Sequence, residues 1–156
     1  MEADAAMKRE VLELVPQQPP FRFIDEIIRL DDEQIVGAYR FREEEYFYRG
    51  HFPGRPITPG VILIETMAQV GVVAFGIYLL SRQRNMRPRD IRLPISLFSL
   101  ADAVEFKKIV QPGERVIVRA KKIYFRKNTI KAGVVMEDEK GETVCSGILS
   151  GVGVDP

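Results

Sequence analysis

The sequence predicts a single α+β domain over residues 1–156, in which a curved antiparallel sheet wraps around one long central helix. The stretch from Val61 to Leu80 is apolar on nearly all sides, which is typical of a helix enclosed by other elements. Several runs rich in β-branched and aromatic residues surround it in the sequence. A chain of 156 residues is long enough for one core and too short for two independent ones.

The expected elements follow one another along the chain. A short amphipathic helix is expected over residues 9–15, ended by Pro16, and a connector follows it through Pro20. Strands are expected over residues 21–30, 35–41, 95–100, 115–125, 129–137 and 143–154. Turn residues at 126–128 and 138–141 separate the last three strands, which are therefore expected to form a meander.

The apolar stretch at 61–80 is also about as long as a lipid bilayer requires. Glu65 and Gln69 argue against a membrane span, because they lie four residues apart on one helix face and ionisable groups are costly in lipid. We therefore expect the central helix of a soluble domain.

Composition excludes several classes of function. Twenty-three Lys plus Arg against twenty-two Asp plus Glu give a net charge of +1, which indicates no nucleic-acid partner. One histidine and one cysteine exclude a two-histidine zinc site and a four-ligand Cys/His cluster, and no metal or other cofactor is expected. The single Cys145 and an N-terminus without signal-peptide features favour the reducing cytoplasm.

The only histidine opens the run His51-Phe52-Pro53-Gly54-Arg55-Pro56-Ile57-Thr58-Pro59-Gly60. Three prolines and two glycines within ten residues predict a stiff, irregular loop whose backbone can approach a ligand closely. Pro59-Gly60 leads directly into the apolar helix, so unpaired amides are expected there. Such amides would stabilise an oxyanion, and the Gly60 amide is the first choice to bind a thioester carbonyl.

Glu65 stands among aliphatic residues little more than one turn into the helix. Burial would raise the pKa of its carboxyl, whereas His51 can titrate near neutrality. With His51 as base and protonated Glu65 as acid, the pair would dehydrate a 3-hydroxyacyl thioester. Glu65 could instead be a first-turn carboxylate stabilised by the helix dipole. Gln69 could orient Glu65, or could be a polar residue at a subunit contact.

The run from His51 to Val61, followed by Glu65, Ala68 and Gln69, resembles the 3-hydroxyacyl-acyl-carrier-protein dehydratases of the FabZ type. The resemblance covers most of the chain and implies a hot-dog fold, with His51 as catalytic base and Glu65 as acid. It also implies homodimers in which each site takes its histidine from one subunit and its glutamate from the other, and by analogy a trimer of such dimers. Gly60, Gln69, Phe52 and Pro53 are expected to contact the substrate.

The chain departs from related sequences at some positions. The FabA-like dehydratase-isomerases carry aspartate where Glu65 stands here, so dehydration without isomerisation is expected. Many family members have Pro-His where this chain has Pro16-Gln17, and Ile109 replaces a common proline. Neither departure touches the expected catalytic pair.

The resemblance implies that the substrate is carried by acyl carrier protein in fatty-acid or related acyl-chain biosynthesis. Basic residues near the site would steer this acidic partner. The candidates are Arg82, Arg84, Arg87, Arg89, Lys107, Lys108, Arg126, Lys127 and Lys131. Residues that could line a tunnel for the acyl chain are Phe21, Phe23, Val72, Phe75 and Phe98. A hot-dog acyl thioesterase and a non-catalytic acyl-binding or assembly subunit remain as alternatives.

Overall fold

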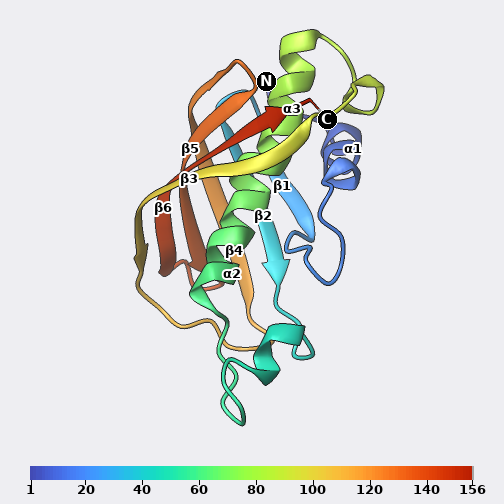
Figure 1. Cartoon of the computed structure of the whole chain (residues 1–156). Helices are drawn as coiled ribbons and strands as arrows, with labels where there is room; N and C mark the ends of the chain where they lie inside the picture. The colour runs from blue at the N-terminus through green and yellow to red at the C-terminus, as the bar shows by residue number, and fades with distance from the viewer. Residues whose placement is uncertain (156) are drawn as a thin grey trace.

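A computed structural model describes residues 1–155 and shows a six-stranded sheet curved around one long helix (Figure 1). All neighbouring strands are antiparallel, in the order β1-β2-β4-β5-β6-β3. The strands are β1 (Glu26–Leu30), β2 (Gln34–Arg40), β3 (Ile95–Phe106), β4 (Arg115–Arg126), β5 (Thr129–Asp138) and β6 (Thr143–Val154). The predicted fold class and the meander β4-β5-β6 are confirmed.

The central helix runs without a break from Gly60 to Arg84. It consists of α2 (Gly60–Ala68), a π-helical segment (Gln69–Ala74) and α3 (Phe75–Arg84), and it ends at Asn85 in the left-handed conformation. By length and mean hydropathy this helix could cross a membrane, but 72% of its apolar window is buried inside the protein. It is therefore the core helix that its sequence predicts.

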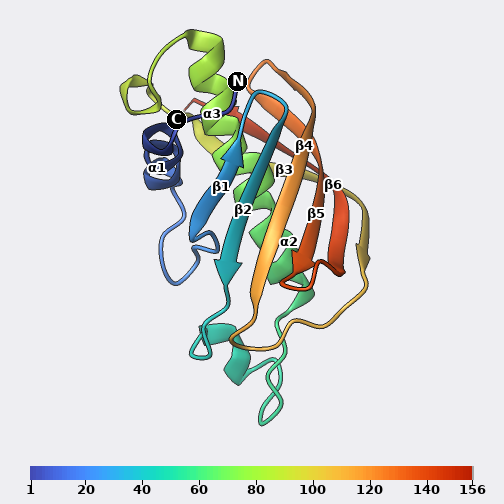
Figure 2. The same ribbon diagram turned by 180° about the vertical axis from the view of Figure 1, so that it is seen from behind.

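The sheet approaches the helix closely where glycines replace larger side chains. A Cβ atom on Gly37 of β2 would lie 2.9 Å from a methyl group of Val70, and one on Gly151 of β6 would overlap Val72. At these two positions the backbone of the sheet therefore lies directly against side chains of the helix. The other face, seen in Figure 2, carries exposed charged residues such as Arg119 and Lys121 of β4.

The first helix and two strands differ from their expected bounds by several residues, whereas the other four strands agree to within one residue. The first helix, α1, spans Ala5–Leu14 and begins earlier than expected because the Asp4 side chain accepts a hydrogen bond from the Met7 amide at 2.8 Å. The expected strand 21–30 begins only at Glu26, and two of the preceding residues, Phe21 and Phe23, instead bond through their backbone to a side chain of the central helix. β3 extends six residues beyond the expected 95–100, since it pairs with β6 as far as Phe106.

The two edges of the sheet differ in their protection. β1 lies beside α1, and the Ala3 amide and the Lys8 ammonium donate to its Leu30 and Ile28 carbonyls. β3 is the opposite edge and has twelve residues, almost all of which are exposed. Long apolar edge strands normally pair or are covered in stable proteins. This edge is therefore the part of the sheet that is open to association.

We expect Gly151→Ala to lower the free energy of unfolding by about 1 to 3 kcal/mol, because the added methyl group overpacks the contact with Val72. Denaturant unfolding followed by circular dichroism measures this change. Gly133→Ala is the matched control, since a Cβ there meets no atom within 4 Å; we expect a change of about 0.5 kcal/mol or less. Equal effects in the two variants would contradict the close helix–sheet contact.

Candidate active site

The loop that carries His51 is held by backbone and side-chain hydrogen bonds on both sides of the histidine. It begins with a short 3₁₀ helix (Tyr46–Arg49) and projects beyond the end of the sheet (Figure 1). The His51 amide donates to the Phe47 carbonyl at 3.0 Å, and the Ile57 amide donates to the His51 carbonyl at 2.9 Å. A buried hydrogen bond of 2.7 Å joins the hydroxyls of Tyr48 and Thr58. The stiff loop expected from the prolines is thus closed on itself.

The imidazole of His51 is oriented by the same loop. Its Nδ1 lies 2.8 Å from the carbonyl oxygen of Ile57, and its ring stacks on Phe52 with centroids 4.2 Å apart. A carbonyl can only accept, so Nδ1 carries the proton in this hydrogen bond. Neutral His51 therefore has its lone pair on Nε2, as a general base requires.

The helix begins directly after this loop with unpaired amides. Pro59 is its N-cap residue and supplies no side-chain hydrogen bond. A Cβ on Gly60 would lie 3.1 Å from the ring of Phe106, so glycine allows that ring, at the end of β3, to lie against the first helical residue. The Gly60 amide is thus available at a helix N-terminus, where partial positive charge favours an anionic ligand.

Glu65 is held in place by Gln69, one turn further along the helix. The Gln69 amide nitrogen donates to Glu65 Oε1 at 3.0 Å and to the Phe21 carbonyl at 2.9 Å, and its oxygen accepts from the Phe23 amide at 2.7 Å. Gln69 is completely buried, so its amide has no competing water contact. These bonds take up backbone groups of Phe21 and Phe23, which lie before the start of β1. The hydrogen bonds of Gln69 favour the first of its two predicted roles, which is to orient the Glu65 carboxyl.

Burial raises the pKa of the Glu65 carboxyl above its ordinary value, and the hydrogen bond from Gln69 opposes that shift. Desolvation has this effect because it disfavours the charged carboxylate. A raised pKa increases the fraction of protonated Glu65 near neutral pH, which is the form that can act as a general acid.

Within one chain, His51 and Glu65 share no hydrogen bond or ion pair among residues 1–155. Each is held by its own partners, the histidine by a loop carbonyl and the glutamate by a helical amide. The predicted substrate contacts Phe52 and Pro53 lie at the exposed tip of the loop, and half of the Phe52 surface is exposed. Their contact with substrate stays a prediction.

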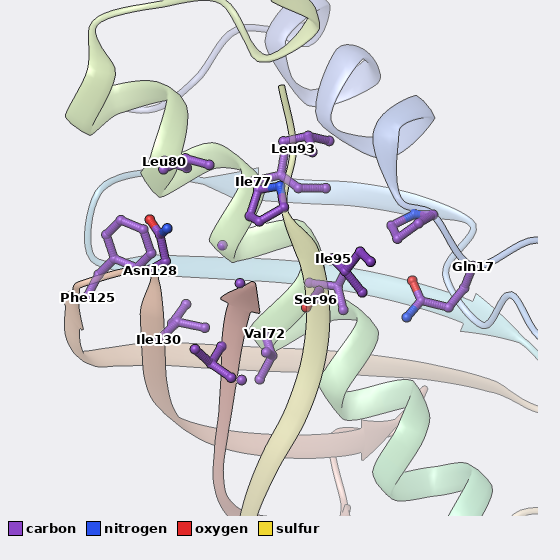
Figure 3. A pocket seen from close by; sticks show the side chains of 17 residues that line it. Gln17, Val72, Ile77, Leu80, Leu93, Ile95, Ser96, Phe125, Asn128 and Ile130 are labelled. Carbon is purple, nitrogen blue, oxygen red and sulfur yellow. The ribbon is translucent and has the colours of Figure 1, made fainter. Parts of the chain in front are cut away.

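A largely apolar cavity of about 520 Å³ lies beside the second half of the central helix (Figure 3). Val72 lines it, whereas the other four residues predicted to line a tunnel do not. Phe23 and Phe75 are completely buried in the core, and Phe21 and Phe98 are more than 40% exposed. The use of this cavity as an acyl tunnel stays a prediction.

Several of the predicted docking cations are already paired. Arg87 and Arg89 contact Glu10 at 3.0 and 2.9 Å, Arg82 contacts Asp32 at 3.1 Å, and Lys108 lies between Asp138 and Glu142. Arg49 and Arg55, which the sequence analysis did not single out, are exposed on either side of His51. Both have no ion pair within residues 1–155. Their sequence position next to the only histidine was the signal that could have identified them.

The similarity to known proteins agrees with this geometry. A family profile described as a FabA-like domain matches residues 15–146. The chain belongs to the FabA-like family. Its relatives include proteins named 3-hydroxyacyl-[acyl-carrier-protein] dehydratase FabZ. That of Caldicellulosiruptor bescii is 34% identical over 90% of this chain and 93% of its own length. That of Roseiflexus castenholzii is 36% identical over 90% and 92%. The resemblance inferred from the His51 motif is confirmed.

Solved structures of a dehydratase complex and of a thioesterase show the same hot-dog fold. A chain of the dehydratase heterocomplex ApeI:P from Xenorhabdus doucetiae has a TM-score of 0.74 and 13% identity, with 94% of this chain and 91% of that chain covered. A hypothetical thioesterase with coenzyme A from Streptococcus pneumoniae has a TM-score of 0.55 and 12% identity, with 84% and 88% covered. Because both identities are low, these likenesses establish the fold alone.

We expect Glu65→Gln to change how stability depends on pH. The raised pKa means that the folded state binds more protons than the unfolded state between the ordinary and the raised value. The free energy of unfolding of the natural protein therefore falls as pH rises through this interval, and the variant lacks this fall. Denaturant unfolding at several pH values measures the difference, with Glu13→Gln on the exposed side of α1 as control. A difference between Glu65→Gln and the natural protein that is independent of pH would contradict the desolvation of Glu65.

Proposed function

We propose that this protein dehydrates 3-hydroxyacyl thioesters on acyl carrier protein to trans-2-enoyl thioesters in fatty-acid or related acyl-chain biosynthesis. The observation that carries the proposal is the imidazole of His51, whose Nδ1 is bound to the Ile57 carbonyl so that Nε2 is left as a base. Membership of the FabA-like family and the many relatives named FabZ support the same reaction.

The proposed reaction uses one proton acceptor and one proton donor. His51 Nε2 takes a proton from the carbon next to the thioester carbonyl, and the electron pair of that C–H bond forms the new double bond. The bond from the β-carbon to its hydroxyl breaks, and Glu65 supplies the proton that turns the hydroxyl into water. The Gly60 amide stabilises the negative charge that develops on the thioester oxygen. Return of the proton from the imidazolium to the Glu65 carboxylate restores the starting state.

The open edge of β3 is proposed to join two copies of the chain. Ile95, Leu97, Leu100 and Phe106 of β3 are each at least 40% exposed, and Val61 at the start of the helix is 73% exposed. An exposed apolar surface of this kind, on an unpaired strand, favours association with a second protein surface. A symmetric dimer would cover the same edge on both copies.

A dimer is also proposed to complete the active site. Phe106 lies against Gly60, so the β3 edge ends at the start of the helix that carries Glu65. A partner on this edge would bring its own His51 loop and helix next to these elements. Each site then takes His51 from one copy and Glu65 from the other. Larger assembly of such dimers stays a prediction.

Acyl carrier protein is proposed to dock beside the His51 loop, in the cytoplasm. Arg49 and Arg55 are exposed on either side of His51, and exposed Lys107, whose ammonium lies 3.8 Å from the Glu105 carboxylate, follows Phe106 at the end of β3. Such exposed cations steer an acidic partner and orient it more than they add to affinity. Arg87 and Arg89 are less suitable, since Glu10 pairs with both of them.

We expect the protein to hydrate crotonyl thioesters reversibly, measured as loss of enoyl absorbance. His51→Ala and Glu65→Gln should each lower kcat by at least about a hundredfold, because each removes one proton group. Both variants should keep the circular dichroism spectrum of the natural protein. Release of free thiol in place of hydration would favour a thioesterase, and full turnover by Glu65→Gln would remove Glu65 from the mechanism.

The shared site is tested by mixing the two inactive variants. After dissociation and reassociation, a mixed dimer of His51→Ala and Glu65→Gln contains one site with both groups intact. Random pairing should therefore restore about a quarter of the natural activity. A mixture that stays inactive, while mass measurements show mixed dimers, would place both groups of each site in one chain.

A further inference from the structure

The cavity shown in Figure 3 lies between the central helix and the strands that face its second half. Val72, Val73, Gly76, Ile77 and Leu80 line it from the helix. Lining groups also come from the start of β3 and the end of β6. Its volume of about 520 Å³ and its largely apolar walls are typical of sites for small apolar ligands.

One connector links this cavity to the predicted acid. Pro16 and Gln17 line the cavity, and a few residues later Phe21 and Phe23 bind Gln69, which in turn binds Glu65. The connector, residues 16–23, therefore lies beside both the cavity and Glu65 along the same helix. An acyl chain attached to a thioester beside Glu65 would follow this connector to reach the cavity.

The spacing along the helix gives the length of such a chain. At a rise of 1.5 Å per residue, Val72 lies about 10 Å beyond Glu65, and Leu80 lies about 22 Å beyond it. An extended chain advances about 1.2 Å per bond, so these distances correspond to about eight and about eighteen bonds. An acyl chain with its β-carbon, carbon 3, at Glu65 therefore enters the cavity at about carbon 11 and reaches Leu80 at about carbon 21.

Building on the proposed dehydratase function, and on the acyl-chain tunnel that the family resemblance implies, we propose that Gln17 makes this cavity favour a long acyl chain that carries a hydroxyl group beside it. The substrate class is thus an acyl thioester of about twelve carbons or more. Gly76 provides the space for the chain, and the Gln17 amide supplies the polar contact.

Gly76 leaves room that any larger residue would fill. A Cβ at this position would meet only a methyl group of Ile130, at 3.9 Å. The cavity wall is therefore open at Gly76, unlike at Gly151 on the facing strand, where a Cβ would overlap Val72. A leucine at position 76 would extend from the helix into the space that the chain needs.

Gln17 is the feature that a plain hydrocarbon chain does not explain. Its Oε1 atom is buried and has no hydrogen-bond partner within residues 1–155. Figure 3 shows its amide directed toward the other lining side chains, on the opposite side of the view from Leu80 and Phe125. Next to an alkyl chain this oxygen stays unpaired, whereas a hydroxyl on the chain can donate to it. Buried polar groups discriminate strongly in favour of ligands that pair with them.

The length of the chain is tested with 2-enoyl thioesters of four, eight, twelve and sixteen carbons in the hydration assay. We expect kcat/KM to rise about tenfold or more between eight and sixteen carbons, because each buried methylene adds binding. Gly76→Leu should lower the ratio of kcat/KM for sixteen against four carbons about tenfold, and Gly76→Val should lower it less. Gly133→Ala, outside the cavity, should keep the natural ratio.

The outcomes separate this inference from the proposed function. If no thioester of any length is hydrated, the proposed function fails. If the four-carbon thioester is hydrated but neither chain length nor Gly76→Leu or Gly76→Val changes the ratio, the tail does not occupy this cavity and only the inference fails.

The role of Gln17 is tested with sixteen-carbon thioesters that carry a hydroxyl at one of carbons 11 to 14, compared with the plain chain. We expect one of these positions to be favoured by the natural protein, and Gln17→Leu to lower the ratio of hydroxylated to plain kcat/KM about tenfold. Equal ratios in the natural protein and in Gln17→Leu at every position would show that Gln17 does not recognise a hydroxyl.

Discussion

The structure depends on one constraint, which is that a helix apolar on nearly all sides must be covered on all sides. The sheet covers one side through close contacts at positions such as Gly37 and Gly151. The connector after α1 covers another, and the exposed β3 edge is where cover within one chain ends. Cover around Glu65 buries its carboxyl and raises its pKa. Where cover is incomplete, the cavity beside Gly76 and the open β3 edge remain.

Gln69 makes a polar site compatible with that apolar helix. A buried amide needs partners for its donor and acceptor groups, and the connector supplies two of them through its own backbone at Phe21 and Phe23. The third partner is Glu65, whose carboxyl is thereby fixed without being neutralised by a cation. A lysine or arginine in place of Gln69 would hold the carboxylate in its charged form, which is unsuitable for donating a proton.

The sequence was sufficient where a pattern has one physical meaning. The apolar run around Glu65, the turns between the late strands and the His51 motif predicted the helix, the meander and the family correctly. It was insufficient where a side chain replaces backbone pairing, as Gln69 does at Phe21 and Phe23. Cavity-lining residues were also missed, because Phe23 and Phe75 are of the same residue types whether they line a tunnel or fill a core.

The two proton groups are each oriented before any second chain is present. The Ile57 carbonyl sets the tautomer of His51, and the Gln69 amide sets the carboxyl of Glu65, through contacts made entirely within one chain. Association on the β3 edge would therefore join two prepared halves, with little side-chain entropy left to lose. This arrangement fits the proposed roles, with the base on a loop rich in proline and the acid on a largely buried helix. In the proposed dimer, such rigid supports would let the subunit contact alone set the distance between the two groups.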